Sequence, residues 1–276
     1  KKNNVNILIV FHSTIDPENK ENKKLSLLSD SLSICDRLIV HSIADLNRLK
    51  KLGLINNVCL LPHGIINIYP PKKYIRNYFR GLFKNYSMRI ASYGFCLPSK
   101  GFKELILSID ILRRRGFNIK LFLYTAIYNQ EFAYFYDELI DLISSLNLQE
   151  HINISREYSS DTNTINNLSR HDCLVFPYQN SNESSSAAVR HGLASLKPVL
   201  VTPSPIFDNV SNLVYYLKGF SPIEIADSLE YNLYSKNNIY EDYNKSKLSK
   251  YQLIENRRFS KVSKRLLNII KSLEIN

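Results

Sequence analysis

Short apolar runs alternate with helix-forming segments along almost the whole chain. Runs such as residues 173–176 (CLVF) are apolar at every position, which is typical of parallel strands buried on both faces of a sheet. Between the runs, apolar residues recur at helical spacing, as Leu46, Leu49 and Leu52 do before Gly53. The alternation predicts an α/β fold of parallel sheets covered by helices. We expect strands at 5–11, 37–40, 58–61, 89–92, 119–124, 152–154, 173–176 and 198–201, and helices at 43–52, 102–115, 132–146, 162–170, 185–195 and 222–234.

One segment interrupts the alternation. Residues 66–85 are rich in Tyr, Pro and Lys and have no clean period, which indicates a linker or a crossing between domains. At 276 residues the chain is long enough for two domains. We therefore expect two doubly wound units, at 1–85 with the linker and at 86–250, followed by a basic amphipathic helix within 251–276. That helix either packs on a sheet or lies on a membrane surface, and packing is the more frequent case.

Composition narrows the classes of function. No apolar run approaches the roughly 18 residues of a membrane span. The four cysteines are scattered without disulfide-rich or metal spacing, which fits reduced thiols in a cytoplasmic protein. Residues 1–85 hold 14 Lys and Arg against 6 Asp and Glu, so most of the excess of positive charge lies in the first third. This excess fits an anionic partner, such as phosphates or an acidic membrane face, and equally a lysine-rich surface without a specific role.

Three predicted loops follow strands and precede helices, where ligands bind in open parallel sheets. Residues 93–101 (YGFCLPSKG) place two glycines, a proline and Lys100 before a helix, which suits a phosphate site, although a solvent-facing lysine in a tight turn is the commoner case. The segment is not a Walker loop. Glu183 and Ser184 to Ser186 open another helix, and there Ser184 can also be a simple N-cap. The loop 202–208 is punctuated by prolines and suits a pocket wall.

Three histidines also end predicted strands. His12 follows the first apolar run, and His41 and His63 occupy the same position after the next two. For each of them a structural role is as frequent as a functional one. The sequence contains no metal-ligand spacing and no recognisable elbow for a nucleophilic serine or cysteine.

Four segments, taken in their order along the chain, resemble the retaining glycosyltransferases of the GT-B fold, family 4. The resemblance is carried by residues 35–42 (CDRLIVHS), 58–64 (VCLLPHG), 90–101 (IASYGFCLPSKG) and 183–199 (ESSSAAVRHGLASLKPV). It implies two Rossmann-like domains, of which the N-terminal one is incomplete because the chain opens at the strand carrying His12. The chain is then a fragment of a longer, multi-domain polypeptide, or another segment completes the sheet.

The resemblance also implies roles for individual residues. Lys100 matches the lysine that neutralises the donor diphosphate, and Glu183 matches the glutamate that contacts hydroxyls of the transferred sugar. Ser185 and Ser186 match the helix N-terminus that cradles the diphosphate, with Ser184 beside them. His12 matches the acceptor-domain histidine near the transferred sugar.

Two positions depart from the family pattern. His191 stands where the family has a second glutamate for the ribose hydroxyls, and Gly94 stands where it has an arginine for the diphosphate. Arg190 is the candidate to replace the missing cation. Both positions belong to the expected donor site, so the departures bear directly on whether the site is active.

The function implied is transfer of a hexose such as mannose from a GDP- or UDP-sugar to a bacterial surface polysaccharide of the O-antigen type or to a lipid-linked glycan. The resemblance implies no metal and no cofactor besides the donor, and a cytoplasmic enzyme peripheral at the inner face of the membrane. A second reading is a non-catalytic, degenerate domain that binds nucleotide or glycan within a larger assembly. Nucleic-acid binding rests on charge alone and lacks the motifs of known RNA-binding modules.

Overall fold

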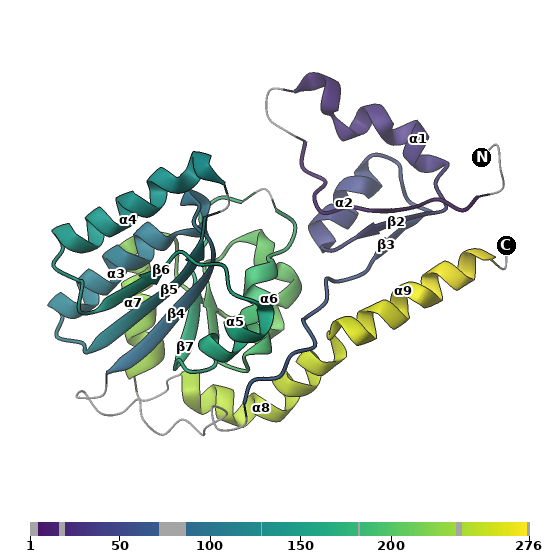
Figure 1. The fold of residues 1–276 in the computed structure, drawn as a ribbon. Coiled ribbons are helices and arrows are strands. Elements are labelled where there is room, and N and C mark those ends of the chain that lie inside the picture. Colours follow the sequence, from purple (N-terminus) through teal and green to yellow (C-terminus); the bar gives the residue numbers. More distant parts are fainter. Residues whose placement is uncertain are drawn as a thin grey trace.

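The part of the chain that the structure describes forms two parallel sheets, each with its own helical layers (Figure 1). The structure is a computed structural model that describes residues 5–16, 20–71, 87–127, 129–181, 183–235 and 239–274. The smaller sheet has three strands in the order β1-β2-β3, and the larger has six in the order β6-β5-β4-β7-β8-β9. The predicted α/β class is therefore confirmed, and the N-terminal sheet is the smaller of the two.

In the larger sheet, the side on which the chain adds successive strands changes at the centre. Its strands are β4 (Met88–Phe95), β5 (Ile119–Ala126), β6 (Ile152–Ser155), β7 (Cys173–Phe176), β8 (Val199–Val201) and β9 (Tyr215–Tyr216). From β4 the chain adds β5 and β6 on one side and then crosses to β7 on the other side. Such a switch leaves a crevice beyond the carboxyl ends of β4 and β7, because the connecting loops diverge there.

Helices cover both faces of this sheet. One face carries α3 (Phe102–Arg114), α4 (Ala133–Ser145) and α7 (Pro222–Tyr234), and the other carries α5 (Asp161–Leu168) and α6 (Ala187–Ala194). In β7, Cys173 and Val175 face the first layer, whereas Leu174 and Phe176 face the second. A strand buried on both sides must be apolar throughout, which explains the run CLVF.

The N-terminal sheet is sandwiched by segments from opposite ends of the chain. Its strands are β1 (Leu8–Val10), β2 (Arg37–Val40) and β3 (Val58–Leu60). One face packs against α1 (Ser29–Ser33) and α2 (Ile43–Lys51) through Leu38 and Val40. On the other face Ile39 and Leu61 pack against Val262 of α9 (Phe259–Glu274). The C-terminal helix therefore returns to the N-terminal sheet as its second layer (Figure 1).

The helix expected over 251–273 is in fact two helices, α8 (Ile239–Asn256) and α9. The chain breaks between them because Ile65, just before the expected linker, binds there: its N–H donates to the Arg257 carbonyl at 2.7 Å, and its carbonyl accepts from Phe259 N–H at 2.8 Å. Arg258 is 1% exposed and donates to the Ile68 carbonyl at 3.1 Å. These bonds take backbone groups that a continuous helix would use internally.

Other elements differ in extent from the expectation. Strand β1 is shorter than 5–11, and β4 and β5 extend to residues 95 and 126. The loop expected at 202–208 enters a 3₁₀ helix, η6 (Pro205–Leu213). Most of the expected linker, residues 72–85, lies outside the described residues. Among the described residues, no helix is long and apolar enough to cross a membrane. Shorter 3₁₀ turns are η1 (Glu21–Lys23), η2 (Leu25–Leu28), η4 (Pro98–Lys100) and η5 (Gln130–Phe132).

Candidate functional site

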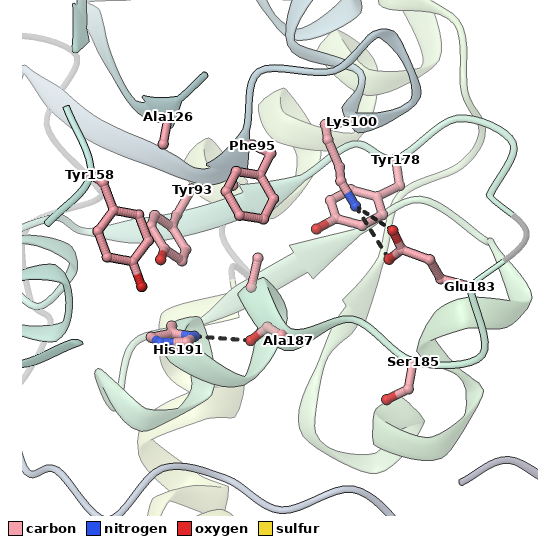
Figure 2. A pocket seen from close by; sticks show the side chains of 12 residues that line it. Tyr93, Phe95, Lys100, Ala126, Tyr158, Tyr178, Glu183, Ser185, Ala187 and His191 are labelled. Carbon is pink, nitrogen blue, oxygen red and sulfur yellow. Dashed lines mark hydrogen bonds and ion pairs between the residues drawn. The ribbon is translucent and has the colours of Figure 1, made fainter. Parts of the chain in front are cut away.

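A pocket of about 230 Å³ opens where the larger sheet reverses, beyond the ends of β4 and β7. Figure 2 shows two distinct ends: Lys100, Tyr178 and Glu183 lie at one, and Tyr93, Tyr158 and His191 lie at the other. The pocket is thus charged at one end and aromatic at the other. Its lining consists of Tyr93, Gly94, Phe95, Lys100, Ala126, Tyr158, Tyr178, Glu183, Ser185, Ala187, Ala188 and His191.

The loop that carries Lys100 is locked in place by the neighbouring loop. Pro98 opens the 3₁₀ turn η4, and Gly101 ends it with φ +72°. A Cβ atom at Gly101 would lie 1.8 Å from the Pro177 carbonyl oxygen, so only glycine fits this close approach. The Gln179 N–H also donates to the Ser99 carbonyl at 2.9 Å. The loops after β4 and β7 therefore hold the lysine as one unit.

The Lys100 ammonium is buried beside a carboxylate that remains accessible. Its Nζ lies 3.4 Å from each carboxylate oxygen of Glu183 and 4.2 Å from the centre of the Tyr178 ring. The lysine side chain is 7% exposed, whereas that of Glu183 is 55% exposed. An ion pair with one exposed partner is weak, because water competes for the carboxylate. The ammonium is therefore available to a stronger anion that enters the pocket.

The N-terminus of α6 lies beside this ammonium. Ser186 is the N-cap, so the alternative that Ser184 caps the helix is wrong. The Ser186 hydroxyl accepts from Val189 N–H at 3.2 Å and donates to the Tyr178 hydroxyl at 3.0 Å. Ser185 lines the pocket, and its hydroxyl accepts from the Asn209 side chain at 3.2 Å. The first amides of a helix point outward with partial positive charge, which favours an anion here.

Ser184 lies behind this helix start. It is 8% exposed, and within the described ranges its hydroxyl makes no hydrogen bond of acceptable geometry. It nevertheless lies close enough to Asp45 of the N-terminal unit to help lower the pKa of that carboxyl group. A buried hydroxyl without a proper partner is uncommon, because leaving one unpaired costs free energy.

His191 closes the aromatic end of the pocket. Its Nε2 lies 2.9 Å from the Asp161 carboxylate, and its Nδ1 lies 3.0 Å from the Ala187 carbonyl. The imidazole centre is 5.2 Å from the ring centre of Tyr93 (Figure 2). The ring is thus fixed by α5 and α6 together.

Arg190 does not line the pocket. Its side chain is buried and donates to the Ser186 carbonyl at 2.5 Å, the Asn209 side chain at 3.2 Å and the His63 carbonyl at 3.3 Å. Burial, with a smaller contribution from Arg257, lowers its pKa to about 10. The guanidinium remains charged at neutral pH and ties α6 to η6 and to the N-terminal unit. Any effect of Arg190 on a bound diphosphate would therefore act through the position of α6.

Three histidines meet at the carboxyl edge of the N-terminal sheet. The ring centres of His41 and His63 are 4.9 Å apart, and His12 lies 5.6 Å from the first and 6.4 Å from the second. Burial lowers the pKa of His41, and it lowers that of His63 to about 4. Burial and the nearby Arg190 thus favour neutral imidazoles. None of the three lines the pocket described above.

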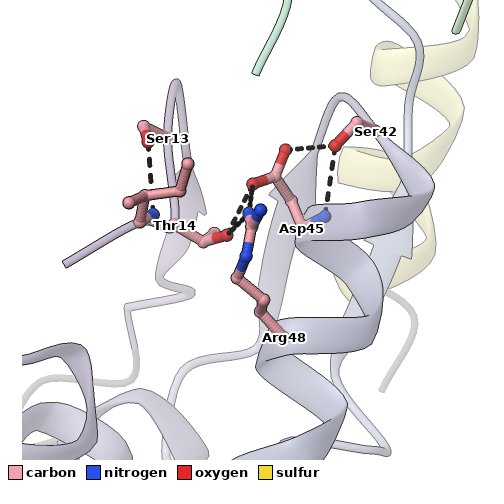
Figure 3. A network of polar contacts seen from close by, with 6 residues as sticks. Ser13, Thr14, Ser42, Asp45 and Arg48 are labelled. Carbon is pink, nitrogen blue, oxygen red and sulfur yellow. Dashed lines mark hydrogen bonds and ion pairs between the residues drawn. The ribbon is translucent and has the colours of Figure 1, made fainter. Parts of the chain in front are cut away.

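A buried carboxylate fixes the chain after His12. Asp45 accepts from the hydroxyls of Thr14, at 2.5 Å, and Ser42, and it forms an ion pair with Arg48 at 2.9 Å (Figure 3). Burial alone would raise the pKa of Asp45, but the hydroxyls of Ser42, Thr14 and Ser184 outweigh it and hold the pKa below its ordinary value. The network joins the segment after β1 to the first turn of α2 and so positions the histidine edge.

The structure brings five of the nine predicted site residues into one pocket, namely Gly94, Lys100, Glu183, Ser185 and His191. His12, Ser184, Ser186 and Arg190 lie outside its lining, and their predicted roles stay predictions. Sequence reasoning missed the aromatic residues Tyr93, Tyr158 and Tyr178. The available signal was that Tyr93 begins the loop 93–101 and that Tyr178 lies in the loop leading to Glu183.

Solved structures with the same architecture are glycosyltransferases and sugar-phosphate synthases. A glycosyltransferase from Rickettsia africae superposes with a TM-score of 0.72 at 16% identity, over 98% of this chain and 71% of that one. Sucrose-phosphate synthase from Thermosynechococcus elongatus gives a TM-score of 0.71 at 14% identity, over 97% of this chain and 68% of that one. The chain has the GT-B fold. Anabaena HepE in complex with UDP-glucose matches with a TM-score of 0.67 at 14% identity, over 98% of this chain and 72% of that one.

These likenesses establish the fold of the chain and the kind of protein that shares it. No family profile and no curated protein matches the sequence. Membership of family 4 and retention of configuration therefore stay predictions, as do the roles of individual residues. Within this fold, the pocket lies beyond the carboxyl ends of β4 and β7, in the unit that contains the larger sheet.

Proposed function

We propose that the protein is a glycosyltransferase that moves a hexose from a nucleoside-diphosphate sugar to a glycan acceptor. The observation that carries this proposal is the buried ammonium of Lys100, which lies in the same pocket as the N-terminal residues of α6. A buried cation beside outward-pointing amides suits a diphosphate, whose charge both groups can neutralise. The aromatic end, with Tyr93 and Tyr158, offers flat apolar surfaces for a nucleoside.

The chemistry follows from the charges that develop. Cleavage of a sugar–phosphate bond places negative charge on the departing diphosphate and positive charge on the anomeric carbon. Lys100 and the α6 amides would stabilise the first without reorganising, because both are held in place before the reaction. Glu183, beside the lysine and accessible, can accept hydrogen bonds from the hydroxyls of the sugar. We propose front-face attack with retention, in which the leaving phosphate takes the acceptor proton and no metal assists the diphosphate.

The finer assignments belong to the same proposal. A transferred hexose such as mannose, an acceptor in a bacterial surface polysaccharide or lipid-linked glycan, and a cytoplasmic enzyme at the inner membrane face agree with the basic first third of the chain. Both GDP- and UDP-sugars remain candidate donors, and the likeness to HepE with UDP-glucose makes UDP the first to test. On α9, Val262 and Leu266 already pack on the N-terminal sheet, so a membrane would have to contact the exposed apolar residues Phe259, Leu267 and Ile270.

The direct test is binding of UDP, GDP, dTDP and ADP to the wild type and to Lys100→Met, measured by calorimetry. Loss of the buried ammonium should weaken nucleoside-diphosphate binding more than about tenfold, because a charge-assisted contact is lost. Lys103→Met is the matched control, since Lys103 lies three residues further on and is exposed. Equal affinities of wild type and Lys100→Met for every diphosphate would refute the proposed donor site.

Measuring turnover distinguishes an active glycosyltransferase from a non-catalytic, degenerate domain. Wild-type protein should slowly hydrolyse the nucleotide-sugar whose diphosphate it binds, and Glu183→Gln should lose this activity while still binding the free diphosphate. Chelator should leave diphosphate binding unchanged if no metal assists it. Binding without hydrolysis or transfer for any donor would favour a degenerate domain within a larger assembly.

A further inference from the structure

Each of the three strands of the N-terminal sheet is followed at its carboxyl end by a histidine, and the three side chains converge. One ring nitrogen from each of His12, His41 and His63 lies within 4.8 Å of the corresponding atoms of the other two. Parallel pairing of β1, β2 and β3 places these ends at one edge, so the convergence follows from the sheet itself. None of the three histidines lines the diphosphate pocket, and of the three only His12 has a predicted role in transfer, near the transferred sugar.

The orientation of the rings leaves one nitrogen free on the buried His41 and one on the half-buried His63. The Nδ1 atom of His41 lies 2.8 Å from the Leu61 carbonyl and can only donate to it, which leaves Nε2 as an unprotonated acceptor. The Nδ1 atom of His63 faces the Gly64 carbonyl at 3.4 Å in the same way. A carbonyl that accepts from the second ring nitrogen is the usual outer support of a metal-bound histidine. His12 is exposed and can turn to complete the set.

We propose that His12, His41 and His63 form a site for a divalent transition-metal cation of the Zn²⁺ class. Three imidazoles and an open fourth position are a known ligand set for such ions. Tetrahedral Zn–N bonds of about 2.0–2.1 Å place ligand nitrogens roughly 3.3 Å apart. The cluster, with nitrogens within 4.8 Å of one another, would therefore close by about 1.5 Å on binding, which rotation of the exposed His12 and small shifts of the other two can supply.

Two charged side chains near the cluster have opposite effects on a bound cation. The Arg190 guanidinium acts on both His41 and His63 and disfavours a cation; its hydrogen bonds to the Ser186 and His63 carbonyls and to Asn209 fix its position without cancelling its charge. The Asp45 carboxylate acts on His41 with the opposite sign. The ion would lie at the junction of the N-terminal sheet and α6, so it is a different site from the diphosphate pocket. Its open position would hold water or another oxygen ligand.

The test is titration of tag-free, chelator-treated protein with Zn²⁺ by calorimetry and with Co²⁺ by visible absorption. We expect one Zn²⁺ per chain and Co²⁺ bands of a four-coordinate nitrogen and oxygen site, without the charge-transfer band of a thiolate ligand. His12→Asn should weaken Zn²⁺ binding more than about tenfold, since even loss of an outer partner costs 10–100-fold. Because His12 is exposed, this variant should keep the fold.

Two further variants complete the test. His63→Asn should weaken binding like His12→Asn, whereas His151→Asn, which removes a histidine far along the chain beside Arg113, should bind like wild type. No stoichiometric Zn²⁺ binding by wild type would overturn the proposal. Binding that survives His12→Asn and His63→Asn, or that shows a thiolate band, would overturn it as well. UDP and GDP binding, measured in parallel, reports the donor site separately.

Discussion

At the scale of single residues, buried His171 makes the stability of the protein depend on pH. It is 1% exposed, its Nε2 lies 2.9 Å from the Tyr124 hydroxyl, and its ring packs 4.6 Å from the Phe122 ring. Burial, and then the positive charge of Arg89, lower its pKa to about 3. The native imidazole therefore stays neutral at pH values at which the unfolded one, with a pKa near 6.5, gains a proton.

Because the unfolded state binds more protons between pH 6.5 and 3, stability must fall as the pH falls through this window. We expect the contribution of His171 to the free energy of unfolding to drop by about 2 kcal/mol between pH 7.5 and 5. Urea unfolding at both pH values should show this loss in the wild type and a smaller loss in His171→Gln. The partly exposed His151, changed to Gln, should alter the difference less. An unchanged pH dependence in His171→Gln would contradict the assignment.

Some site residues could be predicted from the sequence and others could not, for a physical reason. Lys100 and Glu183 stand in loops whose type is set by local signals, namely glycine and proline in one and consecutive serines in the other. The histidine cluster has no such signal, because its members are 29 and 22 positions apart and meet only when three strands pair. Tyr158 reaches the pocket from yet another loop, and its role depends on tertiary structure alone.

At the scale of elements, substitutions at the N-terminus of α6 can test whether a negative charge there weakens diphosphate binding independently of side-chain size. Ser185→Asp and Ser185→Asn introduce side chains of equal size, and either can accept the hydrogen bond that Asn209 now donates to Ser185. A carboxylate at a helix start does not harm the helix, but it repels a diphosphate bound there. We expect UDP and GDP to bind about tenfold more weakly to the Asp variant than to the Asn variant by calorimetry. Equal affinities would show that the anion does not lie at α6.

The break between α8 and α9 could not be predicted from the local sequence pattern. The segment 251–273 has a helical period throughout, so the sequence predicts one helix. The interruption is imposed by Ile65, whose backbone bonds with Arg257 and Phe259 connect positions more than 190 residues apart. By contrast α7 begins where predicted, because its capping box of Ser221 and Glu224 is a local signal.

At the scale of the whole molecule, the two sheets depend on each other through the C-terminal helices. The chain leaves the larger sheet through α8, is held by Ile65 at the break, and returns to the smaller sheet as α9 (Figure 1). The N-terminal sheet has few strands, so it needs this second layer to bury Ile39 and Leu61. The position of α9 therefore couples the stability of the histidine edge to that of the unit that contains the larger sheet.

This dependence predicts a selective loss of order in the N-terminal sheet. Val262→Asp places a carboxylate at a position that is 9% exposed and faces Ile39, which should cost several kcal/mol because the charge has no partner there. Leu267→Asp is the matched control, since Leu267 is 53% exposed on the same helix. Hydrogen exchange should show loss of protection in β2 but not in β7 for Val262→Asp, and neither loss for Leu267→Asp. Unchanged protection of β2 in Val262→Asp would mean that the N-terminal sheet does not rely on α9.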